Sequence, residues 1–193
     1  DMHAFFKNSI IPNETQVKGA FSGTKSFLKV HDAEAFNNQG MLAFSGDVRL
    51  SDFLPEGKLE LSRVTYFGRE PLGGLITLQR TSEGLSLESD NVSWGRASLY
   101  AVSARLSFEK SAQKAALRFS LDKEKESAAD LSLVIPGGQW EKSLLSFKFT
   151  HLPLESLRSI AANLYPNADL SVLDAKRDLM TSGLVYGRFQ EKS

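Results

Sequence analysis

The chain has 193 residues, a length that single β-domains commonly reach, so we expect one module over residues 1–193. Its 23 Lys and Arg residues balance its 23 Asp and Glu residues, and such a chain has no long-range field to attract nucleic acid or an anionic membrane surface. Cysteine is absent, which excludes disulfides, thiolate metal sites and a cysteine nucleophile but leaves the redox compartment open.

The ends of the chain favour an excised or processed piece of a longer β-protein. The first residue is Asp1 rather than an initiator methionine, and residues 183–193 are strand-like until Phe189 and then stop. No stretch reaches the roughly 18 to 20 unbroken apolar residues of a membrane-spanning helix. We therefore expect a β-rich fragment of a longer protein.

The first clear strand signal lies at residues 40–50, after an opening at residues 2–11 that fits either a strand or a short helix. Polar Asp47 and Arg49 alternate with apolar neighbours, and a period of two predicts a half-buried strand. The apolar positions of this strand are Leu42, Phe44, Val48 and Leu50.

Residues 57–68 change parity part-way, which predicts a β-bulge near Arg63. The apolar positions are Leu59 and Leu61 before the change and Val64 and Tyr66 after it. Residues 74–80 and 84–89 follow as two short strands, and we expect a hairpin in which Gly84 supplies a positive φ.

Residues 98–108, SLYAVSARLSF, repeat the period of two, as do three later stretches. One side of the first stretch carries Tyr100, Val102, Ala104, Leu106 and Phe108. The later stretches carry Leu117, Phe119 and Leu121, then Leu131, Leu133 and Ile135, then Leu145, Phe147 and Phe149. The links are short and rich in charge, Pro or Gly, which favours antiparallel neighbours over crossover helices.

One segment, near residues 153–165, has the spacing of a short amphipathic helix. Pro153 suits the first turn of a helix, and Pro166 prevents its continuation. The apolar positions at helical spacing are Leu154, Leu157, Ile160, Ala161 and Leu164.

No set of residues in the sequence predicts catalysis or metal binding. His3, His31 and His151 have no companions at metal-ligand spacing. The chain also lacks a Walker loop, a GxGxxG motif and a GxSxG nucleophile elbow. We therefore expect a protein that is not an enzyme and that has no metal and no cofactor.

The sequence predicts an all-β fold with one short helix, but it leaves open what the apolar faces of the strands cover. They can face one another in a closed β-sandwich or barrel. They can also line the groove of an open, elongated and curled antiparallel sheet. An outer-membrane barrel is disfavoured because several strands are short and the helix has no place in a barrel wall.

Residues 147–171, FKFTHLPLESLRSIAANLYPNADLS, resemble the signature of the TamB and AsmA-like envelope proteins: an LPL opening, a short apolar helix, a proline and a return to strand. Residues 57–108 are similar to the long runs of glycine-punctuated amphipathic strands in these proteins. The resemblance covers the chain from about Gly40 onward. It departs from the family pattern after Ser171, where a glycine-rich strand pair is replaced by VLDAKRDLMTSG.

The resemblance implies a segment of a large protein that is anchored in the inner membrane and lies in the periplasm of a diderm bacterium. Such proteins form an elongated β-taco whose hydrophobic interior carries phospholipid between the inner and outer membranes. TamB-like members also work with an Omp85-type outer-membrane partner, TamA, in the assembly of outer-membrane proteins. The implied partners are thus an acyl-chain ligand, a TamA-like protein and unfolded outer-membrane proteins, and not nucleic acid.

On this resemblance, the apolar strand positions line a lipid groove. The implied lining residues are Leu42, Phe44, Val48, Leu50, Tyr100, Val102, Leu106, Phe108, Leu117, Phe119, Leu121, Leu131, Leu133, Ile135, Leu145, Phe147 and Phe149. Two other functions stay open: a β-sandwich whose loops bind a protein, and a chaperone-like module whose exposed strand edge pairs with an unfolded strand.

Overall fold

The computed structural model describes residues 2–6, 15–65, 70–95, 97–109, 111–124, 127–139, 142–153, 156, 158 and 180–188. Within them, twelve strands form one sheet, and each strand pairs antiparallel with the next along the chain. The strands are β1 (Met2–Phe6), β2 (Thr15–Gly23), β3 (Phe27–Asn37), β4 (Gly40–Arg49), β5 (Pro55–Val64), β6 (Leu72–Arg80), β7 (Gly84–Trp94), β8 (Ala97–Phe108), β9 (Ala112–Ser120), β10 (Ala128–Pro136), β11 (Leu144–Pro153) and β12 (Met180–Arg188). The predictions of an all-β chain and of antiparallel neighbours are confirmed.

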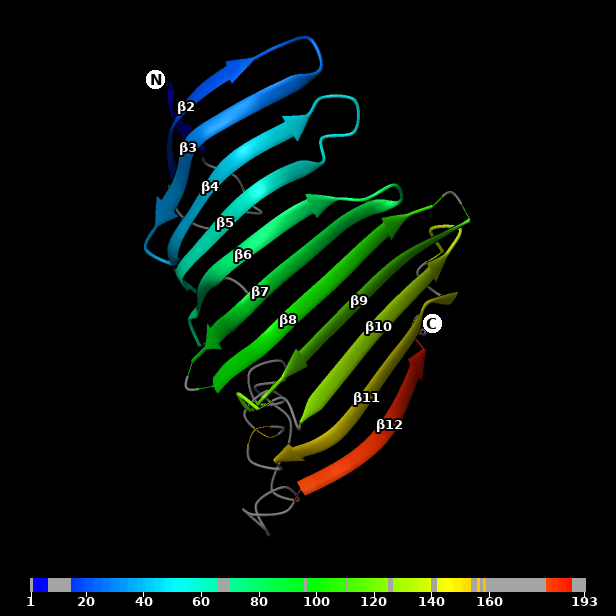
Figure 1. The fold of residues 1–193 in the computed structure, drawn as a ribbon. Coiled ribbons are helices and arrows are strands. Elements are labelled where there is room, and N and C mark those ends of the chain that lie inside the picture. Colours follow the sequence, from blue (N-terminus) through cyan, green and yellow to red (C-terminus); the bar gives the residue numbers. More distant parts are fainter. Residues whose placement is uncertain are drawn as a thin grey trace.

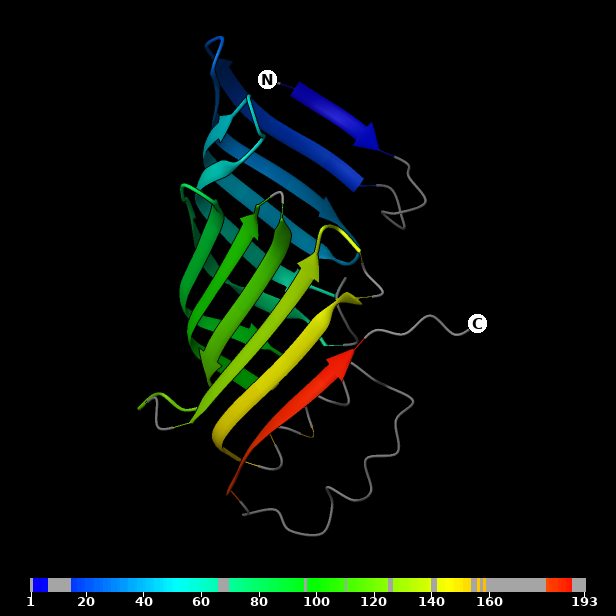
Figure 2. The same cartoon turned by 90° about the vertical axis from the view of Figure 1, so that its right-hand side faces the viewer.

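The strands follow one another along the sheet, from β1 at one end to β12 at the other (Figures 1 and 2). The sheet is bent, but it is neither closed nor strongly curled, so of the predicted curled sheet only the open antiparallel arrangement is confirmed. Each described strand packs mainly against its neighbours within this single sheet. The described strands therefore form neither a closed barrel nor a two-sheet sandwich.

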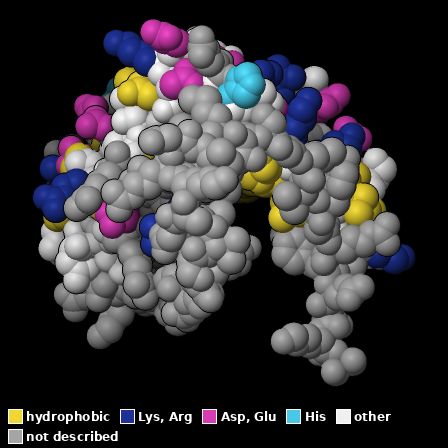
Figure 3. Space-filling view, turned by 90° about the horizontal axis from the view of Figure 1, so that it is seen from below, with side chains coloured by type: hydrophobic (Ala, Val, Ile, Leu, Met, Phe, Trp, Pro, Cys, Tyr) yellow, Lys and Arg dark blue, Asp and Glu magenta, His cyan; other side chains and the backbone are white. Residues whose placement is uncertain are grey.

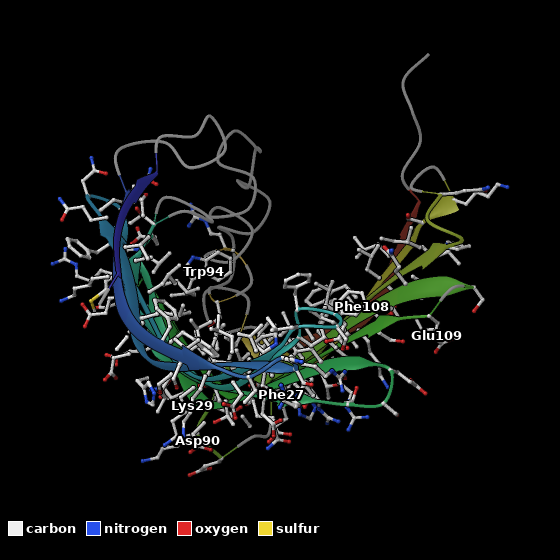
Figure 4. All side chains as sticks on the ribbon, turned by 90° about the horizontal axis from the view of Figure 1, so that it is seen from above. Phe27, Lys29, Asp90, Trp94, Phe108 and Glu109 are labelled. Carbon is white, nitrogen blue, oxygen red and sulfur yellow. The ribbon has the colours of Figure 1, made fainter. Side chains whose placement is uncertain are left out.

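The register gives this sheet an apolar face and a polar face. Phe44 lies opposite Leu59, whereas the adjacent Ala43 lies opposite Glu60, and cross-strand partners share a face. We call the face that carries Phe44 and the residues in register with it the inner face, and the other one the outer face. Figure 4 shows Trp94 and Phe108 on the inner side of the bend and Lys29 and Asp90 on the outer side.

The best-buried part of the inner face lies in the middle of the sheet. Val92, Leu99, Phe119 and Ala129 form a buried cluster from β7, β8, β9 and β10. Partly buried side chains pack against it from β6 to β11: Leu72, Trp94, Val102, Leu117, Leu121, Phe147 and Phe149. Since burying one large aliphatic or aromatic side chain contributes about 1.5–3 kcal/mol, this cluster accounts for much of the cohesion of the sheet.

The predicted bulge near Arg63 is confirmed. The pairing of β5 with β6 shifts between Leu61 and Val64, and Arg63 has a left-handed φ of 52°. The extra residue lets both Leu61 and Val64 reach the inner face, where both are buried. The pairing of β11 with β12 shifts in the same way around His151, whose φ is 49°.

A further bulge, in β8, corrects the prediction for Tyr100. Ala101 has a φ of 49°, and the pairing of β8 with β9 shifts between Tyr100 and Ser103. Tyr100 therefore lies opposite Asn91 and Ser120 on the outer face, while Leu99, which is 8% exposed, takes the inner position. The unbroken alternation expected over residues 98–108 was wrong at this position because the extra residue reverses the parity.

The predicted hairpin of β6 and β7 is confirmed, but the expected role of Gly84 was wrong. Gly84 is not among the residues with a positive φ. Its turn is instead closed by Thr81, whose backbone N–H donates to the Gly84 carbonyl at 3.0 Å and whose Oγ1 accepts from the Gly84 N–H at 3.0 Å. A Cβ on Gly84 would lie 2.0 Å from the Leu106 carbonyl oxygen, so close approach of β8 requires glycine here.

Glycine has a second structural role on the inner face, where Gly46 of β4 lies opposite Gly57 of β5. Their φ values are 153° and 150°. A Cβ on Gly46 would lie 2.1 Å from the Glu56 carbonyl oxygen, and one on Gly57 would lie 2.2 Å from the Ser45 carbonyl oxygen. The two strands therefore approach too closely at this point for any side chain.

Two terminal predictions are partly tested. The opening, which fitted either a strand or a helix, forms β1. The helix expected near residues 153–165 lies mostly outside the described residues: Pro153 ends β11, and Ser156 and Arg158 are helical. Tyr66 also lies outside them.

Among the described residues, no helix is long and apolar enough to cross a membrane.

Candidate functional site

The candidate site is the inner face, because the sheet brings nearly all of the predicted lining residues to it. The register places there Leu42, Phe44 and Val48 of β4, Val102, Leu106 and Phe108 of β8, Leu117 and Phe119 of β9, Leu131, Leu133 and Ile135 of β10, and Leu145, Phe147 and Phe149 of β11. Leu50 and Leu121 lie just beyond the ends of β4 and β9, and Leu121 packs against the buried cluster. Tyr100 is the predicted lining residue that lies on the outer face.

The predicted lining set left out several inner-face residues that are as well buried as its best-buried members, Ile135 and Phe119, which are 6% and 8% exposed. The residues left out are Val30, Leu61, Val64, Leu78, Leu85, Val92 and Leu99, all at most 8% exposed. The period of two marks Leu61, Leu78 and Leu85. Val92 and Leu99 gave no such signal, because the parity of their strands changes beside them. The inner face is therefore continuous from β3 to β11 rather than confined to the strands with the longest alternation.

The inner face holds almost no charge. Among the described strand residues in inner-face register, Arg80 is the one ionisable side chain, and it stands at the end of β6. Its guanidinium donates to the Leu54 carbonyl at 3.4 Å and to Glu56 Oε2 at 2.5 Å, and it lies 5.2 Å from the centre of the Phe27 ring. The charge is thus neutralised at the margin of the apolar surface.

The loop between β4 and β5 forms a second polar cluster at the same margin. Arg49 donates to both carboxylate oxygens of Asp52, and the Leu54 N–H donates to Asp52 Oδ1 at 3.1 Å. The hydrogen bond with Arg49 is the main reason that the pKa of Asp52 is held below its usual value, and it raises the pKa of Arg49. This loop presents Phe53, which is 74% exposed, to solvent.

Most of the described outer-face side chains are polar, with exceptions such as Leu75 and Leu144, which are 52% and 46% exposed. Figure 3 shows Lys, Arg, Asp and Glu side chains along the outer margin of the molecule. Lys18 pairs with Glu34 across β2 and β3 at 2.8 Å, and Arg118 approaches Asp130 across β9 and β10 at 3.6 Å. Ser132 and Ser146 share a hydrogen bond of 2.7 Å between β10 and β11. The polar side chains of the outer face thus interact with water, whereas the inner face is an apolar surface.

The inner face can hold an apolar chain by burial. Several of its side chains are only half-buried, among them Val102, Leu106 and Phe147, and Phe108 is 55% exposed. No group of three or more metal-ligating side chains occurs within the described ranges. Among the histidines, His31 shares a 3.0 Å hydrogen bond with Ser22 Oγ on the outer face.

Comparison of the chain with protein-family models, with curated proteins and with solved structures found no match.

Proposed function

We propose that the chain is a segment of a TamB- or AsmA-like envelope protein whose inner face shields phospholipid acyl chains in transit between the inner and outer membranes. The observation that carries this proposal is the inner face: one open antiparallel sheet presents a nearly uncharged apolar surface from β3 to β11. The resemblance of residues 147–171 to the family signature supplies the periplasmic setting in a diderm bacterium.

In this proposal, the bent sheet is one section of a longer, β-taco-like trough. An acyl chain gains about 0.8 kcal/mol for each methylene that it buries, and this gain requires no specific contact. Half-buried side chains such as Val102 and Leu106 would exchange solvent for the lipid tail. Transport of this kind requires no catalytic residue, which agrees with a non-enzymatic protein.

Native mass spectrometry of the chain, purified after expression in a bacterial envelope, tests the proposal when combined with organic extraction of bound lipid. We expect phospholipid to copurify, and we expect Val102→Glu with Leu106→Glu to abolish it. A matched control is Ser103→Glu with Ser107→Glu, which adds the same charge to the outer face of the same strand. This control should retain the lipid.

Phe108→Glu guards against loss of lipid through unfolding, because Phe108 is already 55% exposed at the end of β8. Its circular dichroism should match that of the parent while the amount of bound lipid falls. A lipid-free parent that excludes acyl probes would overturn the proposal. Equal lipid content in the inner-face and outer-face variants would do the same.

An interaction at the sheet edges is a second candidate function, favoured by the open sheet. In the described part of the chain, β1 and β12 each pair with one neighbour only, so each leaves a row of backbone groups for another strand. A chaperone-like role would use these edges to bind unfolded outer-membrane strands or a TamA-like partner. Edge substitutions would weaken that binding and spare lipid content, which separates the two functions.

A further inference from the structure

The outer face carries two adjoining depressions near the bulges of β5 and β8. The first has a volume of about 440 Å³ and is lined by Asp90, Asn91, Tyr100, Ala101 and Lys123. The second, of about 330 Å³, shares Asn91 with the first, and Ser62, Arg63 and Ser93 contribute to its lining. Both volumes fall within the range of roughly 300–1,000 Å³ that is typical of small-molecule sites.

The backbone builds these depressions with conformations that cost free energy. Ala101 and Arg63, one in each lining, have φ values of 49° and 52°. A non-glycine residue in this left-handed region is strained, because its Cβ lies too close to the following carbonyl oxygen. The bulge at Ala101 turns Tyr100 outward beside Asn91, and Figure 4 shows Asp90 on the same outer side. Such outliers tend to cluster at functional sites.

The polar side chains of the first depression are uncommitted. Within the described residues, the structure gives no hydrogen bond or ion pair to the side chains of Asp90, Asn91, Tyr100 or Lys123. Elsewhere on the same face, Lys18 has Glu34 as its cross-strand partner. Asp90, Asn91 and Lys123 are exposed, so their donors and acceptors are available to a ligand in the depression.

We propose that these depressions form a binding site for a short oligosaccharide. A sugar hydroxyl both donates and accepts hydrogen bonds, and the first depression offers a carboxylate acceptor, an ammonium donor, and an amide and a phenol that do both. Within the first depression, Asp90 and Lys123 carry opposite charges, so this part of the site does not favour a lone anion. Tyr100 also lines the first depression, and an aromatic ring can pack against the C–H face of a sugar.

The second depression extends the site by another sugar unit. Ser62 and Arg63 contribute a hydroxyl and a guanidinium. The Ser93 hydroxyl donates to the Gly73 carbonyl at 3.1 Å and keeps its own oxygen as an acceptor. Because the two depressions meet at Asn91, a linear saccharide would bridge them there. The polar side chains of the site lie on the outer face, although Leu61 and Leu72 of the inner face also contribute to the lining of the second depression. The proposal does not rest on the lipid function.

Titration of the ¹⁵N-labelled chain, followed by amide chemical shifts, tests the site with four probes: maltotriose, cellobiose, N,N′-diacetylchitobiose and inorganic phosphate. At least one saccharide should shift the amides of Asn91, Tyr100 and Ala101 saturably. We expect Asn91→Ala and Tyr100→Ala each to weaken that binding by about tenfold or more, which corresponds to about 1.4 kcal/mol.

Ser107→Ala, on the outer face of the same strand but outside both depressions, is the matched control and should bind the saccharide as the parent does. Tyr100→Phe keeps the ring and removes only the phenol, so its binding should fall between those of the parent and Tyr100→Ala. The proposal fails if no saccharide shifts these amides at concentrations well above the millimolar range. It also fails if phosphate shifts them as strongly as the sugars, which would indicate a general anion site.

Discussion

The two faces of the sheet share the same strands and the same backbone hydrogen bonds, yet they contribute differently to the molecule. The inner face holds the buried cluster of Val92, Leu99, Phe119 and Ala129. The outer face holds exposed pairs such as Lys18 with Glu34, whose side chains are 49% and 34% exposed. Exposed ion pairs contribute at most about 1 kcal/mol each, so the stability of the sheet depends mainly on the inner face. Substitutions on the outer face should therefore change the free energy of unfolding only slightly.

The sharpest test of this difference compares neighbouring residues of β9. Phe119→Ala should lower the free energy of unfolding by about 3–5 kcal/mol, because it removes a buried aromatic side chain. Arg118→Ala, one residue away on the outer face, should cost no more than about 1 kcal/mol. Urea unfolding followed by circular dichroism measures both. Similar losses for the two variants would contradict the assignment of stability to the inner face.

Gly46→Ala tests whether an inner-face position without a side chain affects the free energy of unfolding as strongly as Phe119 does. A Cβ on Gly46 would lie 2.1 Å from the Glu56 carbonyl oxygen at a φ of 153°, so we expect a loss of about 2–3 kcal/mol in unfolding free energy. Gly138→Ala is the control: its φ is 73°, but no atom lies within 4 Å of the new Cβ. A Gly46→Ala chain that unfolds at the same urea concentration as Gly138→Ala would refute the close approach of β4 and β5.

Arg80→Ala tests whether a charged residue at the margin of the inner face contributes more to stability than a charged residue on the outer face. The Arg80 side chain is 15% exposed and bonds to Glu56 and to the Leu54 carbonyl, so we expect a loss of about 2 kcal/mol in the same urea experiment. Lys18→Ala, which breaks an exposed pair on the outer face, should cost less than about 1 kcal/mol. A larger loss for Lys18→Ala than for Arg80→Ala would mean that exposure does not determine how much each ion pair contributes to stability.

The smallest expected effect is the pH dependence of the Arg49–Asp52 pair. The hydrogen bond from Arg49 lowers the pKa of Asp52 in the folded chain. Its stabilisation is therefore complete above the carboxyl pKa of the unfolded chain and is lost as the pH falls through the lower folded pKa. Asp52→Asn should be slightly less stable than the parent at neutral pH, with a difference that narrows in acid. A difference in urea midpoint that stays constant or widens would contradict this.

The sequence predicted the strands from β4 onward, their antiparallel order and most of the inner face, because each of these follows from local alternation. It did not predict β2 (Thr15–Gly23) or β3 (Phe27–Asn37). It also predicted the bulge at Arg63, since polar Ser62 and Arg63 separate Leu61 from Val64 and make the change of parity visible. The bulge at Ala101 gave no such sign. Leu99, Tyr100, Ala101 and Val102 are four successive apolar residues, and either parity fits them.

By itself, the sequence determined that this chain forms amphipathic strands with one apolar face, because the pleat of a strand sends alternate side chains to opposite sides. Tertiary structure decided which way the ambiguous residues point. It turned Tyr100 outward and Leu99 inward, since only the pairing of β8 with β7 and β9 reveals where an extra residue is accommodated. It also decided that the apolar faces form one open surface rather than two opposed layers, because a period of two is the same whatever the strand covers.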